Sequence, residues 1–388
     1  MSGPRDAARI PLRVAVDVTP MIGPRTGIGQ FTAGLVTALD DRCDVEVTRF
    51  AVTIRGRRTA AIDSRPIPAR AVTRLWGQAD HPRLDRFLRN PVEVVHGTNY
   101  LVPPTGAAAL VSVHDLTMVR YPELCRPETL RFAALVRRAV SRGAAVHADS
   151  VFVADEIRTW LPAADVHVVH PGIHAPGPAT PRRPSGPPWI VAVGTIEPRK
   201  DYPTLLRAFG ELAGSTDRRE LRLVIVGQPG WGVDAFEAAL SVLPEAARSR
   251  VDRRGYVADD ERDRLLDGAA AFVYPSRYEG FGIAPLEAMA RGVPVVATRA
   301  GSLPEVLGDA ALLVDVGDAS ALAAALESVL DNPSPWTDRG RVWVEKYRWN
   351  DAAEAMASLY RHLAERRSAS WRSRPLRVSA RSRHEARA

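Results

Sequence analysis

The sequence predicts an α/β protein made of two similar-sized halves, each built on a parallel sheet. In both halves, short apolar runs of strand length alternate with longer amphipathic segments, an order typical of parallel strands joined by right-handed crossovers. A segment with six prolines in fifteen residues, 174–188, separates the halves and is interpreted as a linker. The length of 388 residues also favours two domains over one.

The N-terminal half, residues 1–173, begins with the strand LRVAVDV. A glycine-rich turn, TPMIGPRTGIGQF, leads to a helix predicted over 32–39, and a second helix is predicted over 130–141. VEVVHGT, ALVSVHDL, AAVHADS and Val166–His170 predict further strands. Ligands of parallel sheets bind at the carboxyl ends of strands, which makes the polar residues there candidate contacts. These residues are His96, Asn99, His114, Asp115 and Ser150.

The C-terminal half, residues 189–349, repeats the alternation. Its predicted strands are WIVAVGT, LRLVIVG, VDRRGYV, AAFVYPS, VPVVAT and ALLVDV. Helices are predicted over 202–212, 231–243 and 259–269. A last helix over 350–365 is expected to pack back towards the N-terminal half. We expect a cleft between the halves, where the carboxyl ends of the strands lie.

The segment 274–306, YPSRYEGFGIAPLEAMARGVPVVATRAGSLPEV, carries the most specific pattern in the chain. Glu279 lies in a loop before a predicted helix, and Glu287 lies in the first turns of that helix. The free N–H groups at the helix start can meet an anion. Two carboxylates beside an anion site suit a ligand with many hydroxyl groups and a phosphate, such as a sugar nucleotide. On spacing alone, solvated carboxylates that favour the helix dipole explain the pattern equally well.

ExxxxxxxE with GFG inside it, followed by GVPVVAT and SLPEV, resembles the signature of retaining glycosyltransferases of family 4. The resemblance extends from VAVDVTP to about Trp349. It implies the GT-B fold, with two Rossmann-like domains whose parallel sheets face a central cleft, and transfer of a hexose from a nucleoside diphosphate sugar to a hydroxyl group. It also implies that Glu279 binds the donor sugar and Glu287 the ribose. The N–H groups implied to meet the donor are those of Phe281, Gly282 and Ile283.

The segment GTIEPRKD places Arg199 and Lys200 in the loop after a strand, where two cations suit a diphosphate. Asp201 is expected to cap the following helix. An Arg-Lys pair alone is usually exposed charge, but GTIEPRKD resembles the phosphate-binding segment of the same family. Many relatives carry a basic residue where this chain has Thr195, so Arg199 and Lys200 are expected to hold the diphosphate without it.

Three shorter segments complete the implied donor site. TGIGQF contains Gly27 and Gly29 but has Thr32 at the third glycine position of a dinucleotide fingerprint, so that match fails. In the family, the corresponding loop approaches the donor diphosphate, and Gly29 is the position carried over. HDLTMVRYPE resembles family members whose histidine faces the donor sugar, which makes His114 a candidate catalytic residue. The segment that matches GYV in relatives lies beside the nucleobase, which implies a backbone contact at Val257.

The sequence contains no Asp-x-Asp pair and no His/Cys cluster with metal-ligand spacing. We therefore expect metal-independent catalysis without a cofactor, with the leaving nucleotide stabilised by cations and helix N-termini. The sequences of the motifs most resemble those of the mannosyltransferase-like branch, which acts on surface polysaccharide or lipid-linked glycans. This similarity favours GDP-mannose as donor. A nucleotide-sugar epimerase of the same fold and a non-catalytic nucleotide-sugar-binding protein are the alternatives.

The net charge of +7 equals that of residues 366–388, which contain eight Arg and one Glu. This segment has few large apolar residues and is predicted to be a disordered basic tail, either solvated or in contact with anionic lipid or an acidic acceptor. Nucleic acid is not expected as a partner, because no recognised binding motif accompanies the charge. No apolar run of membrane-spanning length and no signal peptide is found. We expect a cytoplasmic protein with reduced thiols, peripheral at the inner face of the membrane.

Overall fold

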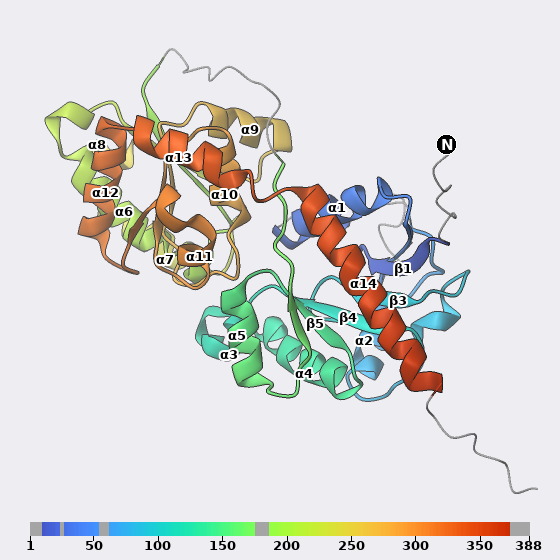
Figure 1. Cartoon of the computed structure of the whole chain (residues 1–388). Helices are drawn as coiled ribbons and strands as arrows, with labels where there is room; N and C mark the ends of the chain where they lie inside the picture. The colour runs from blue at the N-terminus through green and yellow to red at the C-terminus, as the bar shows by residue number, and fades with distance from the viewer. Residues whose placement is uncertain (1–9, 24–26, 54–61, 175–185, 373–388) are drawn as a thin grey trace, which may run out of the picture.

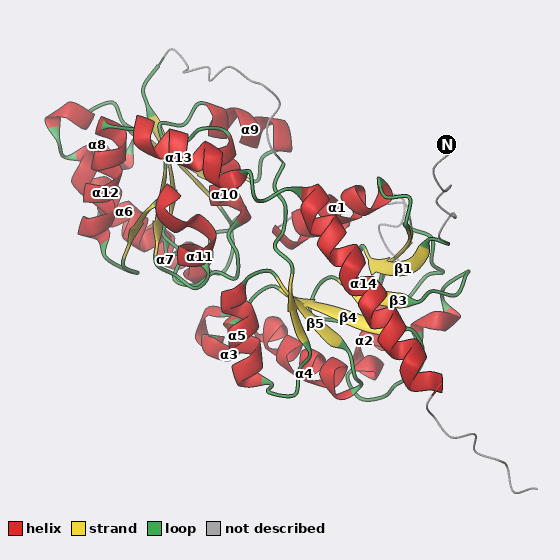
Figure 2. Ribbon diagram, in the orientation of Figure 1, coloured by secondary structure: helices red, strands yellow, loops and turns green. Residues whose placement is uncertain are grey.

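Two six-stranded sheets form the framework of the protein, one in each half of the chain (Figure 1). The computed structural model describes residues 10–23, 27–53, 62–174 and 186–372. All the strand pairs of both sheets are parallel. Parallel neighbours need crossover connections, and helices supply most of them (Figure 2). The predicted α/β class with two parallel sheets is confirmed.

The N-terminal sheet has the strand order β2-β1-β3-β4-β5-β6 and is covered on both faces. Alternate residues of β1 belong to different cores, Ala15 to one and Val14 and Val16 to the other, because successive side chains of a strand point to opposite faces. The strands are β1 (Leu12–Asp17), β2 (Val45–Phe50), β3 (Val94–Gly97), β4 (Ala108–Val113), β5 (Ala145–Ala148) and β6 (Val166–Val168). The helices are α1 (Gly27–Asp40), α2 (Ala69–Trp76), α3 (Thr117–Arg120), α4 (Pro127–Ser141) and α5 (Val151–Trp160).

The C-terminal sheet has the order β12-β11-β10-β7-β8-β9 and again lies between two apolar cores. Its strands are β7 (Trp189–Val193), β8 (Arg222–Val226), β9 (Val251–Gly255), β10 (Ala271–Tyr274), β11 (Val295–Thr298) and β12 (Leu312–Val314). Its helices are α6 (Tyr202–Ala213), α7 (Val233–Ser241), α8 (Glu245–Arg248), α9 (Asp259–Asp267), α10 (Ile283–Ala290), α11 (Leu303–Leu307), α12 (Ala319–Asp331) and α13 (Ser334–Val344).

The chain passes between the domains twice, and the two passages touch. Ile173 bridges to Arg348, and its N–H group donates to the carbonyl of Tyr347 at 3.0 Å. Most of the predicted proline-rich linker, residues 175–185, lies outside the described residues. The two crossings between the domains therefore lie side by side.

The C-terminal helix α14 (Trp349–Arg372) packs on the N-terminal domain (Figure 1). Ala353, Met356 and Tyr360 are fully buried there, in the same core as β1 and α1. The helix continues past residue 365 to Arg372, so the start of the segment predicted to be disordered is helical. The reason is local: no proline or glycine interrupts the chain before Pro375, and alanine and arginine favour helix. Residues 373–388 lie outside the described residues.

Several helices differ from the prediction. Helix α1 begins at Gly27, five residues before the predicted start, because packing of the first turn outweighs the weak helix preference of glycine. Helix α4 begins three residues early, with Pro127 in its first turn. The elements that were not predicted from the sequence are strand β2 and helices α2, α3, α5, α8, α11, α12 and α13. Of these, α12 carries a clear start signal, because Asp318 accepts a hydrogen bond from Ala321 N at 2.9 Å.

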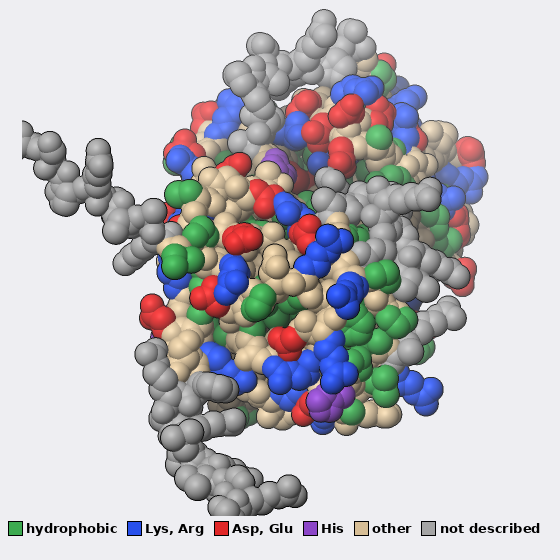
Figure 3. All heavy atoms as spheres, turned by 90° about the vertical axis from the view of Figure 1, so that its right-hand side faces the viewer, with side chains coloured by type: hydrophobic (Ala, Val, Ile, Leu, Met, Phe, Trp, Pro, Cys, Tyr) green, Lys and Arg blue, Asp and Glu red, His purple; other side chains and the backbone are tan. Residues whose placement is uncertain are grey.

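The surface carries mixed charge. Acidic and basic side chains are interspersed on the face shown in Figure 3. Cys43 is exposed and Cys125 is partly buried, and both are free thiols. Within the described part of the chain, no helix has the length and apolar character needed to cross a membrane.

Candidate active site between the domains

A cleft of about 390 Å³ lies between the two domains, at the carboxyl ends of strands from both sheets. The predicted site residues that line it are His114, Arg199, Lys200, Val257, Glu279, Phe281, Gly282, Ile283 and Glu287. A larger hollow of about 650 Å³ lies at the opposite, amino ends of β4 and β5. Cations around that hollow are engaged: Arg142 donates to Val102 O, and Arg366 pairs with Asp165. The cleft therefore holds the candidate site.

Glu279 forms a buried ion cluster with both predicted phosphate-binding cations. Its Oε1 lies 2.6 Å from Nζ of Lys200, and its Oε2 lies 2.8 Å from Nη1 of Arg199. Lys200 also donates to the hydroxyl of Tyr274, and Arg199 also pairs with Glu197 at 2.7 Å. Burial alone would raise the pKa of Glu279, but the charges of Arg199 and Lys200 outweigh it and hold that pKa at about 2. Glu279 is therefore ionised at neutral pH.

The loop after β7 sets this geometry through its backbone. It forms a short 3-10 turn, Pro198–Lys200, and is tied to the loop of Glu279 by a hydrogen bond from Arg277 N to Arg199 O at 2.7 Å. The predicted capping role of Asp201 is wrong, because its side chain makes no capping hydrogen bond. Its backbone is left-handed, with φ of 46°, instead of the extended conformation usual for a capping residue, and its carboxylate faces Arg277.

The start of α10 combines an anion-binding end with a buried carboxylate. Gly282 precedes the helix with φ of 96°, which favours glycine, and a Cβ there would lie 2.7 Å from the Leu303 side chain. The first N–H groups of the helix have no carbonyl partner within it. Glu287, one turn further on, is buried, and its Oε1 lies 3.8 Å from Nη2 of Arg262. Burial raises the pKa of Glu287, and the charge of Arg262 offsets only part of that effect.

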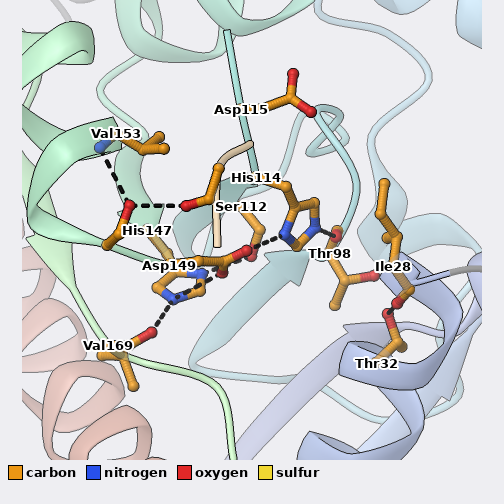
Figure 4. A network of polar contacts seen from close by, with 12 residues as sticks. Ile28, Thr32, Thr98, Ser112, His114, Asp115, His147, Asp149, Val153 and Val169 are labelled. Atoms are coloured by element: carbon orange, nitrogen blue, oxygen red, sulfur yellow. Dashed lines mark hydrogen bonds and ion pairs between the residues drawn. The ribbon is translucent and has the colours of Figure 1, made fainter. Parts of the chain in front are cut away.

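His114 lies between two acceptors, as Figure 4 shows. Its Nδ1 is 2.7 Å from Oδ2 of Asp149, and its Nε2 is 2.7 Å from the carbonyl oxygen of Thr98. A backbone carbonyl only accepts hydrogen bonds, and an ionised carboxylate does the same, so these two partners favour the form of His114 that carries a proton on each ring nitrogen. Burial lowers its pKa, but the charge and hydrogen bond of Asp149 and the Thr98 carbonyl together raise it. The protein thus engages both ring nitrogens of His114 and favours the charged form of the ring beside the cleft.

Other strand-end candidates act within the fold. His96 bonds to the hydroxyls of Tyr360 and Ser112, which ties α14 to the sheet, and burial keeps its pKa well below the usual value. Ser150 caps α5 by accepting from Val153 N. Asp115 does line the cleft, and its side chain accepts from Thr117 N at 2.9 Å.

The comparisons with known proteins identify the family. Residues 178–348 match the family model of Glycosyl transferases group 1. Glycogen synthase of Mycobacterium tuberculosis is 31% identical over 297 residues, which cover 69% of this chain and 68% of that protein. The chain is a member of the group 1 glycosyltransferases.

Similarity to two further proteins covers nearly the whole of this glycosyltransferase. The O-antigen chain mannosyltransferase B of Escherichia coli is 28% identical over 392 residues, which cover 91% of this chain and 100% of that protein. The solved structure of sucrose-phosphate synthase from Thermosynechococcus elongatus superposes with a TM-score of 0.71 and 21% identity, and covers 92% of this chain and 100% of that one. The predicted GT-B fold is confirmed.

The structure places Gly29 differently from the other predicted donor contacts of this glycosyltransferase. Gly29 is buried in the first turn of α1, and the described residues of α1 that line the cleft are Gly27, Ile28, Gln30 and Phe31. The hydroxyl of Thr32 donates to Ile28 O at 2.9 Å, as in a regular helix (Figure 4). The segment is a helix end in place of the expected loop, which turns the neighbours of Gly29 to the cleft.

Four further residues of the site were not found from the sequence: Asp149, Glu197, Tyr274 and Arg262. Asp149 follows a predicted strand and could have been selected by the strand-end rule that selected Ser150. Glu197 and Tyr274 become relevant only because they partner Arg199 and Lys200. Within the described residues, no group of His, Cys, Asp and Glu side chains could hold a metal ion.

Proposed function

We propose that this glycosyltransferase is a retaining enzyme of family 4 that moves mannose from GDP-mannose to a hydroxyl group of a glycan or lipid-linked acceptor. The observation that carries the proposal is the buried cluster of Glu279, Arg199 and Lys200 in the cleft wall. It places a carboxylate suited to sugar hydroxyls beside two cations suited to a diphosphate. The mannosyltransferase name of the Escherichia coli relative supports the choice of sugar.

The diphosphate is assigned to the cations and to the start of α10. The ammonium group of Lys200 has three donors, and Tyr274 and Glu279 take two of them, which leaves one for a phosphate oxygen. The guanidinium group of Arg199 has five N–H donors, of which those on Nη1 and Nη2 already meet Glu279, Tyr278 O and Glu197, so a phosphate would share this cation with the protein. Phe281, Gly282 and Ile283 line the same cleft at the N-terminus of the helix, where backbone N–H groups favour an anion.

The reaction follows from these assignments and from the family resemblance. The bond between C1 of the sugar and the diphosphate oxygen breaks, and the acceptor oxygen bonds to C1 from the face that the diphosphate leaves. The proton of the acceptor hydroxyl passes to the departing diphosphate. Arg199, Lys200 and the α10 N-terminus stabilise the negative charge that develops there. Glu279 orients the sugar hydroxyls, and Glu287 binds the ribose.

A thermal-shift panel tests the donor assignment. The protein is titrated with GDP, UDP and ADP and with GDP-mannose, UDP-glucose and ADP-glucose, since a ligand that binds only the folded state raises Tm. GDP and GDP-mannose are expected to give the largest shifts. Absence of any shift overturns the proposal, and a larger shift with uridine or adenine nucleotides overturns the choice of donor. Conversion of the donor to its epimer indicates an epimerase, and binding without turnover, with acceptor glycans present, indicates a binding protein.

The proposal includes contact with an anionic membrane through residues 366–388. Each Arg near such a surface contributes about 1 kcal/mol, and salt screens this attraction. Full-length protein and a variant that ends at Glu365 are sedimented with anionic and neutral vesicles at low and high salt. Stronger binding of the full chain to anionic vesicles at low salt supports the contact, and equal binding of both proteins contradicts it.

A further inference from the structure

Tyr278, directly before Glu279, inserts its side chain from the C-terminal domain into the N-terminal domain. Only 2% of its surface is exposed. Its hydroxyl accepts from Leu116 N at 3.1 Å and donates to the carboxylate of Glu156 on α5, and its ring lies 5.2 Å from that of Tyr121. A buried hydroxyl with two partners fixes position in a way that an exposed contact does not. Leu116 lies two residues after His114.

Glu305 makes a second contact across the domains, from the SLPEV motif. Its two carboxylate oxygens accept from Val151 N and Phe152 N, each at 2.8 Å. These are the first two N–H groups of α5, which have no partner inside the helix, and a carboxylate there is favoured by the helix dipole. Val151 lies two residues after Asp149. The C-terminal domain thus holds the chain just beyond each member of the His114–Asp149 pair.

Both contacts are linked to the backbone of Glu279: Tyr278 is its neighbour in the chain, and the segment of Glu305 is hydrogen-bonded to it. Ser302, three residues before Glu305, donates its N–H and hydroxyl groups to Glu279 O at 2.9 and 3.2 Å. Ser150 donates to Gly280 O at 2.8 Å. A Cβ on Gly280 would lie only 1.7 Å from the carbonyl oxygen of His114, so the loops of Glu279 and His114 touch through a position that admits only glycine.

We propose that Tyr278, Gly280 and Glu305 are positioning residues that set Glu279 against the His114–Asp149 pair across the contact between the domains. The catalytic consequence of this role rests on the proposed function, whereas the coupling of the two contacts does not. If both contacts form as one unit, loss of either one must loosen the other. If each is only a local surface contact, its loss affects its own partners alone.

Hydrogen exchange of the full-length protein distinguishes these cases without any substrate. Tyr278→Phe keeps the ring but removes the bond to Leu116, and Glu305→Ala removes the bonds to Val151 and Phe152. We expect Tyr278→Phe to speed exchange at Val151 and Phe152, and Glu305→Ala to speed exchange at Leu116, by roughly two- to tenfold, as the loss of one hydrogen bond allows.

Two matched controls exclude general destabilisation. Tyr360→Phe removes a buried hydroxyl bond to His96, away from the contacts between the domains, and Glu327→Ala removes an exposed carboxylate on α12. Neither is expected to change exchange at Leu116, Val151 or Phe152. Exchange that rises only at the partners of the substituted residue, or equally in the controls, overturns the proposal.

Kinetics tests the catalytic consequence. Tyr278→Phe together with Glu305→Ala removes both contacts between the domains and leaves the assigned donor contacts in place, and it is expected to lower kcat at least about tenfold. The Kd of GDP should stay within about twofold, because the proposed diphosphate and ribose contacts all lie in the C-terminal domain. A parallel loss of GDP affinity and kcat overturns the positioning role. Wild-type protein that binds no nucleotide overturns the proposed function instead and leaves the exchange result to decide the coupling.

Discussion

Oε1 of Glu279 lies 2.6 Å from Nζ of Lys200 in the wall of the cleft, and less than a tenth of either residue is exposed. The loop after β10 is thus joined to the loop after β7 by a buried ion pair in the free protein. A diphosphate that enters must share Lys200 with Glu279, because the carboxylate is already ionised. This arrangement holds the proposed sugar-binding and phosphate-binding groups in place before the donor arrives.

Glu279→Gln is expected to lower turnover by about ten- to a hundredfold, as the loss of a charged hydrogen bond to the donor sugar implies. The apparent GDP affinity should be largely retained, because the carboxylate is assigned to the sugar. Loss of one partner of a buried ion pair costs about 3–5 kcal/mol, so the free variant should melt at a lower temperature. Steady-state kinetics and calorimetry measure both effects. Near wild-type turnover contradicts the role of Glu279.

Lys200→Ala is expected to weaken binding of GDP and of the donor by about ten- to a hundredfold, because a charge-assisted contact contributes about 1.5–3 kcal/mol. Lys346→Ala is the matched control, since Lys346 lies over the ring of Trp343, away from the cleft. Isothermal titration with GDP compares the two variants. Equal affinity in both contradicts the assignment of Lys200 to the diphosphate.

Asp149→Asn tests the charged state of His114. The pKa of His114 is raised in the folded protein, so the stability from its pairing with Asp149 is fully present below pH 6.5 and is lost as pH rises through the folded pKa. The difference in Tm between wild type and Asp149→Asn should therefore be largest near pH 6 and shrink towards higher pH. Thermal melts across this range give the answer. A difference that grows with pH would mean that His114 is neutral.

Glu287→Gln is expected to stabilise the free protein and to weaken its binding of GDP. Burial raises the pKa of Glu287, so its ionised form opposes folding at neutral pH, and a neutral amide removes that penalty. Binding of GDP should fall by about ten- to a hundredfold if the carboxylate holds the ribose hydroxyls. Melting curves and titrations of the same preparation provide the comparison. A variant that is less stable and binds GDP normally would point to a structural role for the carboxylate.

The sequence predicts the two sheets and most of the cleft lining because those features depend on local patterns. Buried parallel strands have apolar runs, and the motifs around Arg199 and Glu279 lie within single loops. The start of α1 was missed because Gly27 and Gly29 indicate a turn, whereas packing of the helix decides otherwise. The orientation of the His114 ring could not be predicted, since it depends on Asp149, which lies 35 residues away along the chain.

The contacts between the domains were also beyond sequence reasoning. SLPEV contributed to the family resemblance, but nothing local indicates that Glu305 meets the N–H groups of Val151 and Phe152. Those residues lie about 150 positions earlier, on α5, a helix that was itself not predicted. Partners far apart in the chain become visible only once the two domains are placed together.

Proton NMR of the reaction determines whether the protein transfers mannose from GDP-mannose with retention and without a metal. The protein is incubated with GDP-mannose and a panel of mannose-terminated acceptors, with EDTA and with added Mg²⁺. We expect equal release of GDP in both conditions and a product whose anomeric configuration matches that of the donor. A product of inverted configuration, activity that EDTA abolishes and Mg²⁺ restores, or transfer from UDP-glucose or ADP-glucose instead of GDP-mannose would overturn the proposed reaction.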